Sequence, residues 1–148
     1  MKEKLKILFL CTGNSCRSQM AEAWTRSLKK DWIEPYSAGV EIHGLNPDAV
    51  LVMEEAGVDM TGHESKHIDQ FKDTQLDVVI TLCGHARETC PWFPPRCRVI
   101  HVGFEDPPRM AMEVAQQGGN RGKQLDCYRK VRDEIRAFVE QMPENLFQ

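Results

Sequence analysis

The sequence predicts an α/β sandwich built on a parallel sheet of four strands. Short apolar runs alternate along the chain with longer stretches in which apolar residues recur at helical spacing. Two of these runs, at residues 5–10 and 76–82, are apolar almost throughout, as is typical of strands buried on both faces of a parallel sheet. The 148 residues, of which 41% are hydrophobic and 28% charged, suffice for a core, and we take residues 1–148 as a single domain.

The elements follow one another in the order of this fold class. Pro35 places the second strand at an edge of the sheet, because proline cannot donate a hydrogen bond to a neighbouring strand. Asn46 before Pro47 is a typical helix start. In chain order we expect a strand at 5–10, a helix at 20–28, a second strand at 33–40, a helix from Asn46 to Gly57, a polar segment with a short helix at 59–71, a third strand at 76–82, a surface segment at 84–95, a fourth strand at 98–102, a flexible loop at 118–122 and a long amphipathic helix at 125–142.

Composition excludes several classes of protein. The formal net charge of −3 argues against a nucleic-acid-binding protein, which would be basic. The charged first residues and the short apolar run after them match neither a signal peptide nor a membrane span. We therefore expect a cytoplasmic protein that acts as a monomer, with no nucleic-acid or membrane partner.

Six cysteines in a cytoplasmic protein indicate redox or metal chemistry more than a permanent disulfide framework. Their spacing is wide and irregular, unlike that of a structural zinc site, and we expect neither a metal nor a cofactor. His63, His67, His85 and His101 show no ligand spacing and are expected at loop or surface positions. Cys97 and Cys127 are expected to have no chemical role.

The stretch that carries chemistry lies between the first strand and the first helix. A loop at this place presents backbone N–H groups at a helix N-terminus, where they bind tetrahedral oxyanions. Its residues are Cys11, Thr12, Gly13, Asn14, Ser15, Cys16, Arg17 and Ser18. We predict that this loop binds an oxyanion and that Cys16 packs within it.

Two residues of the loop have the chemistry of a reaction centre. The helix N-terminus, the loop N–H groups and Arg17 all favour the thiolate form of Cys11, which is the nucleophilic form. The Arg17 guanidinium offers two parallel N–H donors to an oxyanion. Ser18 is placed to donate a further hydrogen bond to the sulfur, Asn14 and Ser15 to hold the loop, and Gly13 to supply dihedral freedom.

Three reactive side chains follow three different strands of the predicted sheet. They are Cys11 after the first strand, Cys83 after the third and Asp106 after the fourth. The carboxyl ends of parallel strands meet at one edge of a sheet, so these side chains are expected to lie close together. Asp106, before Pro107, then acts as a general acid for a leaving oxygen. The alternatives are a buried apolar Cys11 and a turn-forming Asp106.

The motifs resemble those of a known family. The Cys11-x5-Arg17-Ser18 pattern with a distant Asp106-Pro107 is similar to the low-molecular-weight protein tyrosine phosphatase fold. The segments at 81–91 and 101–107, with Cys83 and Cys90, are similar to the thioredoxin-coupled arsenate reductases that share that fold. The resemblance extends over nearly the whole chain and implies a three-layer sandwich with the flavodoxin-like strand order 2-1-3-4.

The resemblance also implies a mechanism for reducing arsenate to arsenite. Cys11 attacks arsenate, Asp106 assists the departure of water, and Cys83 then attacks Cys11, which leaves a Cys11–Cys83 disulfide. Cys90 next attacks Cys83, and thioredoxin reduces the resulting Cys83–Cys90 disulfide. If residues 83–90 were helical, the two Cα atoms would lie about 10 Å apart along the axis, beyond the roughly 7 Å limit of a disulfide. We therefore predict that this segment unwinds on oxidation.

Some members of the resembled family bind potassium behind the loop. Asn14, Glu22 and Ser37 match part of that ligand set, but Lys66 stands where those members have an acid. Lys66 has two interpretations. Its ammonium group takes the place of the cation, or it is an ordinary solvated lysine on the surface. Two alternatives to an arsenate reductase are a phosphatase and a non-catalytic protein that binds oxyanions or senses redox state. Weak phosphatase activity is expected in any case, because the nucleophile, the arginine and the acid are all present.

Overall fold

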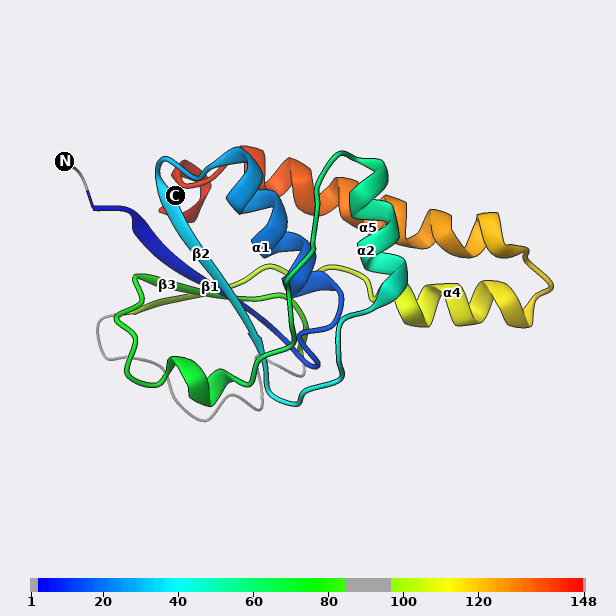
Figure 1. The fold of residues 1–148 in the computed structure, drawn as a ribbon, viewed down its shortest axis with the longest axis horizontal. Helices are drawn as coiled ribbons and strands as arrows, with labels where there is room; N and C mark the ends of the chain where they lie inside the picture. The colour runs from blue at the N-terminus through cyan, green and yellow to red at the C-terminus, as the bar shows by residue number, and fades with distance from the viewer. Residues whose placement is uncertain (1–2, 85–96, 148) are drawn as a thin grey trace.

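Four parallel strands form one sheet in the order β2-β1-β3-β4 (Figure 1). β1 (Leu5–Cys11) lies between β2 (Ile33–Gly39) and β3 (Val78–Thr81), and β4 (Arg98–His101) lies beyond β3. These elements are seen in a computed structural model that describes residues 3–84 and 97–147. The predicted class and strand order are confirmed, and β2, which contains Pro35, is an edge strand.

Helices cover the sheet and extend beyond it. In Figure 1, α1, α2 and α5 lie on one side of the sheet and the short helix η1 lies on the other. α4 and α5 form a hairpin that extends past the carboxyl ends of the strands. The bounds are α1 (Arg17–Leu28), α2 (Pro47–Glu55), η1 (Ile68–Phe71), α4 (Pro107–Gln116), α5 (Arg121–Glu140) and η2 (Glu144–Leu146). No helix in residues 3–84 and 97–147 is long and apolar enough to cross a membrane.

The hairpin differs from the sequence prediction. α4 was not predicted, although Pro107 and Pro108 open it and proline is favoured in the first turn of a helix. Of the α4 residues only Pro107 is buried, and Met110 and Ala111 are partly buried against the core. The predicted loop at 118–122 is also too long. α5 already begins at Arg121, where the Asn120 side chain caps it by accepting a hydrogen bond from the Lys123 N–H.

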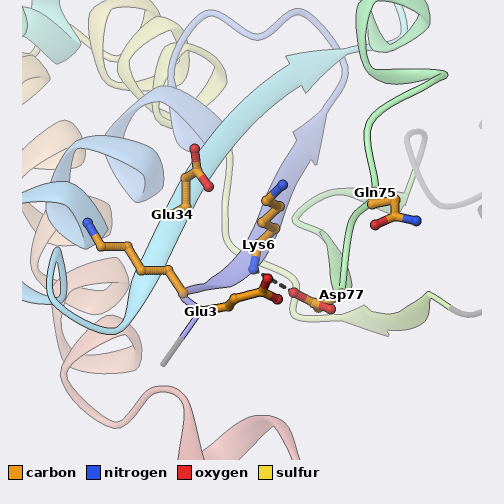
Figure 2. Close-up of a pocket in the computed structure, with 6 residues that line it drawn as sticks. Glu3, Lys6, Glu34, Gln75 and Asp77 are labelled. Atoms are coloured by element: carbon orange, nitrogen blue, oxygen red, sulfur yellow. Dashed lines mark hydrogen bonds between the residues drawn. The ribbon is translucent and has the colours of Figure 1, made fainter. Parts of the chain in front are cut away.

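The amino-terminal ends of the described strands are lined by polar and charged side chains. A hollow of about 310 Å³ opens there between Lys6 of β1, Glu34 of β2 and Asp77 before β3 (Figure 2). It contains acids and lysines together, and the Asp77 carboxylate accepts a 2.8 Å hydrogen bond from the Lys6 backbone N–H. Its lining includes no cysteine. The reactive residues therefore gather at the opposite end of the sheet.

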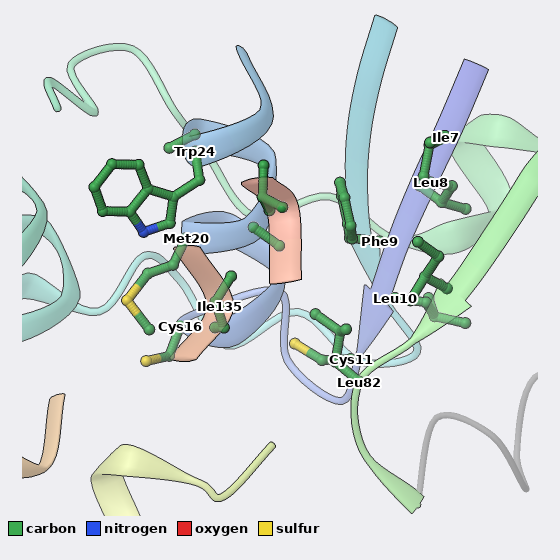
Figure 3. Packing of buried hydrophobic residues seen from close by; sticks show 14 of the residues in the cluster. Ile7, Leu8, Phe9, Leu10, Cys11, Cys16, Met20, Trp24, Leu82 and Ile135 are labelled. Carbon is green, nitrogen blue, oxygen red and sulfur yellow. The ribbon is translucent and has the colours of Figure 1, made fainter. Parts of the chain in front are cut away.

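The hydrophobic core positions β1 and the start of α1. Residues 7–10 are fully buried, as expected of a central parallel strand, and belong to one hydrophobic core with Met20 and Trp24 of α1 and Ile135 of α5 (Figure 3). The Trp24 indole N–H also donates to the Arg132 carbonyl on α5 at 3.1 Å. Because Cys11 is the last residue of β1, this packing fixes where the loop begins.

Gly39, at the end of β2, lies against the backbone of the loop. A Cβ atom at this position would be 2.6 Å from the Glu41 carbonyl oxygen and 2.7 Å from the Asn14 nitrogen. Neither backbone atom can move without shifting the loop, so only glycine fits here.

We predict that Gly39→Ala lowers the free energy of unfolding by about 2–3 kcal/mol, since the added methyl group overlaps backbone atoms. Urea unfolding followed by circular dichroism measures this. The matched control is Gly122→Ala in the first turn of α5, where a Cβ atom has ordinary contacts and stability should not fall. Equal stability of the wild type and the Gly39 variant would contradict the close packing.

Candidate active site

A cavity of about 350 Å³ opens at the carboxyl ends of the strands. Its floor is the loop between β1 and α1, and its other walls come from two distant segments of the chain. The lining residues are Cys11, Thr12, Gly13, Ser15, Cys16, Arg17, His43, Asn46, Asp106 and Pro108. The structure thus brings the predicted oxyanion loop and Asp106 together.

The first wall continues the pairing of β1 with β2. The N–H groups of Val40, Glu41 and His43 donate to the carbonyls of residues 11, 12 and 13 at 3.3, 2.9 and 3.1 Å. The His43 imidazole lies so close to Gly13 that a Cβ atom there would overlap it. Gly13 is therefore required by this close approach. The predicted need for dihedral freedom applies at its neighbour, Asn14.

Asn14 holds the loop in its shape. Its φ of 48° is the one positive value among the described non-glycine residues, and its side chain is fully buried. The Asn14 Oδ1 atom accepts hydrogen bonds from Gln19 Nε2 at 2.9 Å and from the Lys66 backbone N–H at 2.8 Å. The Asn14 carbonyl accepts another from the Ser65 hydroxyl at 2.7 Å. Hydrogen bonds from α1 and from residues 65 and 66 therefore hold Asn14 in its left-handed backbone conformation.

A chain of hydrogen bonds leads from Asn14 to the sulfur of Cys11. Asn14 Nδ2 donates to Ser18 Oγ at 2.8 Å, and Ser18 Oγ lies 2.9 Å from Cys11 Sγ. When Cys11 is a thiolate, the sulfur can only accept, so the Ser18 hydroxyl is the donor. Its proton points at the sulfur because Asn14 already occupies an acceptor position of the hydroxyl oxygen. The predicted Ser18–Cys11 contact is confirmed.

Arg17 and Asp106 face each other across the cavity. Arg17 Nη1 donates to the Phe104 carbonyl at 2.9 Å, and Nη2 lies 3.7 Å from Asp106 Oδ1. The Arg17 side chain is 12% exposed, whereas that of Asp106 is 43% exposed. Asp106 occupies the N-cap position of α4, but its carboxylate makes no capping hydrogen bond. The carboxylate is therefore available to the cavity, which favours a chemical role over that of a turn residue.

Cys83 lies next to the loop. Cys83 is buried, and its Sγ atom lies 3.2 Å from the hydroxyl of Thr12, the residue after Cys11. The backbone leads to the same place, because the Leu82 N–H donates to the Leu10 carbonyl at 2.9 Å. The structure thus places Cys83 beside the loop, as predicted. Cys90 and the predicted unwinding segment fall outside the described residues, apart from Cys83 and Gly84.

Cys16 differs from Cys11 although both belong to the loop. Burial, followed by the nearby Cys11, raises the pKa of the Cys16 thiol well above its usual value. Cys16 therefore stays a neutral thiol near pH 7, consistent with its predicted packing role. Cys127, also buried, has its thiol pKa raised by burial as well.

A polar cluster lies behind the loop around Glu22. The Glu22 carboxylate is nearly buried and accepts hydrogen bonds from the Ser37 hydroxyl at 2.7 Å and from Arg26 at 3.0 Å. Lys66 Nζ lies 3.9 Å from Glu22 Oε1 and donates to the Glu64 carbonyl at 3.1 Å. Lys66 therefore faces the cluster and is only 22% exposed, unlike a solvated surface lysine.

His63 lies in the loop between α2 and η1, as predicted, and its side chain belongs to this cluster. Its side chain is 12% exposed, and its Nδ1 atom lies 2.9 Å from Gln19 Oε1. Burial lowers the pKa of His63, more than the attraction of the Glu22 carboxylate raises it. Within the described residues no group of three or more His, Cys, Asp or Glu side chains is arranged to hold a metal ion.

Sequence reasoning did not identify His43 and Asn46 as lining residues. Asn46 was interpreted as a helix cap, which it is, because its Oδ1 atom accepts from the backbone N–H groups of Asp48 and Ala49. Its second position, on the wall of the cavity, depends on how the segment after β2 folds back along the loop. No local pattern indicates that path.

This fold, with a cysteine and an arginine at the two ends of a loop after the first strand, defines a phosphatase-like class of oxyanion-binding proteins. Residues 6–148 match the low molecular weight phosphotyrosine protein phosphatase family, and the chain belongs to that family.

Within the family, the chain is similar to arsenate reductases. Arsenate reductase 1 of Bacillus cereus is 42% identical over 144 residues, which cover 97% of this chain and 98% of the relative. A solved arsenate reductase in the oxidized state has a TM-score of 0.74 and 32% identity, over 93% of this chain and 95% of its own. Another, in the phosphate binding state, has a TM-score of 0.65 and 30% identity, over 94% and 99% of the two chains. The resemblance seen in the sequence is confirmed.

We predict that Ser18→Ala slows alkylation of Cys11 by iodoacetamide at pH 7 about tenfold, because a hydrogen bond to the thiolate is lost. Mass spectrometry of the peptide that contains Cys11 measures the rate at that cysteine alone. Ser27→Ala, at the exposed end of the same helix, is the matched control and should react like the wild type. Equal rates for the two variants would contradict the assigned direction of the hydrogen bond.

Proposed function

We propose that this protein reduces arsenate to arsenite with its own thiols. The observation that carries the proposal is a buried thiol from outside the loop, Cys83, in contact with the residue next to Cys11. A hydrolytic phosphatase needs one cysteine, whereas reduction of arsenic(V) to arsenic(III) needs two electrons, which two thiols supply as they form a disulfide. The names of the relatives, and the oxidized and phosphate binding states of two of them, support the same function.

The first step is binding and substitution. Arsenate, which has the shape and charge of phosphate, binds the loop N–H groups and the Arg17 guanidinium. The Cys11 thiolate attacks the arsenic atom and forms a sulfur–arsenic bond, while one oxygen leaves as water. Asp106 supplies a proton to that oxygen, a role supported by its carboxylate, which makes no capping hydrogen bond and lies 3.7 Å from Arg17. Arsenic remains in the pentavalent state at this point.

Electrons move in the second step. The Cys83 sulfur attacks the Cys11 sulfur, a disulfide forms, and the electron pair of the sulfur–arsenic bond passes to arsenic, which leaves as arsenite. Thr12 supports this step because its hydroxyl lies 3.2 Å from the Cys83 sulfur. Cys90 then attacks Cys83, which frees Cys11 and transfers the disulfide to Cys83–Cys90.

Regeneration requires an external dithiol. We propose thioredoxin for this role, since a cysteine pair that exchanges disulfides with a dithiol protein completes the cycle without a bound cofactor. The same proposal includes a cytoplasmic location, where such reductants occur, and a monomer that acts as one domain over residues 1–148.

Phosphatase activity is the second candidate function. Cys11, Arg17 and Asp106 are the groups that hydrolysis of a phosphate ester needs, and all three line one cavity. We propose that a weak phosphatase activity accompanies the reductase. Because hydrolysis does not involve Cys83 or Cys90, serine at either position should leave it unchanged.

The Glu22 cluster completes the proposal. Some members of the resembled family bind potassium, and Asn14, Glu22 and Ser37 of this chain match residues that serve there as ligands. Here we propose that the Lys66 ammonium supplies the positive charge in place of the ion, because it lies 3.9 Å from the buried Glu22 carboxylate.

The central prediction concerns three serine variants and the release of arsenite in the presence of a thioredoxin system. Cys11→Ser, Cys83→Ser and Cys90→Ser should each abolish multiple turnover, but Cys90→Ser should release about one arsenite per chain before it stops. Cys97→Ser and Cys127→Ser are matched controls that should keep the wild-type rate. Sustained turnover by the Cys83 variant would contradict the relay, and no arsenite from the wild type would favour a non-catalytic oxyanion-binding protein.

The cation proposal predicts that potassium and sodium at equal ionic strength give the wild type the same rate within about twofold, because no ion site is open. In Lys66→Ala the Glu22 carboxylate loses its neighbouring ammonium, and potassium should then raise the thermal midpoint. Lys72→Ala, at the end of η1, is the matched control. A strong acceleration of the wild type by potassium would show that a cation site is open.

A further inference from the structure

We propose that Asn46 is an oxyanion-binding residue whose side-chain amide donates a hydrogen bond to the bound oxyanion, and that Tyr128 positions this amide. The proposal rests on the oxyanion site of the proposed function and adds a donor from outside the loop. Its evidence is the set of hydrogen bonds that fixes the Asn46 side chain at the wall of the cavity.

Asn46 is fastened to the oxyanion loop. Its backbone N–H donates to the Ser15 carbonyl at 3.0 Å, and Asn46 lines the same cavity as Cys11, Arg17 and Asp106. This hydrogen bond fixes Asn46 relative to the loop, at the wall of the cavity. A donor placed there adds to those of the loop backbone.

The orientation of the Asn46 amide follows from its partners. Oδ1 accepts from the N–H groups of Asp48 and Ala49 at 2.8 and 3.2 Å, which only the carbonyl oxygen of the amide can do. Nδ2 is consequently directed toward Tyr128, whose hydroxyl oxygen accepts from it at 3.2 Å. One oxygen and one N–H of the amide are thus used within the protein.

The second N–H of that amide has no hydrogen-bond acceptor among residues 3–84 and 97–147. A primary amide carries two N–H donors, and Tyr128 engages only one of them. An unpaired amide N–H next to a polar cavity donates a hydrogen bond to an acceptor that binds in the cavity. A tetrahedral oxyanion bound to the loop presents outer oxygens toward this wall, and each is an acceptor.

Tyr128 is suited to hold the amide still. It lies on α5 and is only 4% exposed, so the surrounding packing holds its side chain in one position. Burial raises the pKa of Tyr128 above its usual value, so its hydroxyl stays neutral near pH 7. Tyr128 does not line the cavity, and it acts on the oxyanion only through Asn46.

The test measures binding of inorganic phosphate by calorimetry, which requires no reduction. Asn46→Ser keeps the α2 cap, since serine is a good N-cap residue, but removes the amide donor. We expect its dissociation constant for phosphate to rise about tenfold, with KM for arsenate rising in parallel and kcat nearly unchanged. Tyr128→Phe keeps the buried ring and loses the hydroxyl, and its dissociation constant should rise about threefold.

Combining the two changes separates positioning from a structural effect. If Tyr128 acts through Asn46, the double variant Asn46→Ser/Tyr128→Phe should bind phosphate no more weakly than Asn46→Ser alone. The control is Asn120→Ser, the same replacement at the N-cap of α5, where Asn120 accepts from the Lys123 N–H away from the cavity. It should bind phosphate like the wild type.

Three results would overturn the proposal. If Asn46→Ser bound phosphate with wild-type affinity, the Asn46 amide would not be a donor to the oxyanion. If the losses of affinity were additive in the double variant, Tyr128 would not act by positioning Asn46. Failure of the wild type itself to bind phosphate would overturn this inference and the oxyanion site together. Loss of arsenite release with phosphate binding intact would affect only the proposed function.

Discussion

The buried side chain of Asn14 is the constraint on which the site depends. A left-handed backbone conformation costs a residue with a side chain about 1–2 kcal/mol, and it persists only where the surroundings impose it. Here Asn14 accepts from Gln19 and Lys66 and donates to Ser18, and its carbonyl accepts from Ser65. The same amide thus holds the loop in this conformation and donates to the hydroxyl that faces the Cys11 sulfur.

The loop does not make the site alone. Its walls come from the segment after β2, which pairs with the loop through backbone hydrogen bonds, and from the segment between β4 and α4, whose Phe104 carbonyl holds Arg17. Because all the strands are parallel, these segments begin at the same end of the sheet, where the strands have their carboxyl ends. Cys83 follows β3 at that end too. Thr12 lines the cavity and its hydroxyl contacts the Cys83 sulfur, so the second thiol lies next to the proposed oxyanion site.

The parts that could be predicted from the sequence are those with a short-range pattern. The cysteine–arginine spacing of the loop, the apolar strands and the strand-end positions of Cys83 and Asp106 indicated the fold and where the reactive groups meet. α4 was missed although proline favours the first turn of a helix and the apolar residues of α4, among them Met110 and Ala111, lie on one face. The cavity roles of His43 and Asn46, and the burial of His63, depend on packing between distant segments, which no local pattern encodes.

The central claim is that this protein supplies two electrons to arsenic from two of its own thiols, Cys11 and Cys83. It is tested most directly by mixing the fully reduced protein with excess arsenate in the absence of any reductant, and by measuring arsenite together with the mass and disulfide map of the intact chain. The account predicts one arsenite per chain, a mass loss of two hydrogens, and a disulfide that includes Cys83. Arsenite formed without any disulfide, or a disulfide that excludes Cys83, would contradict it.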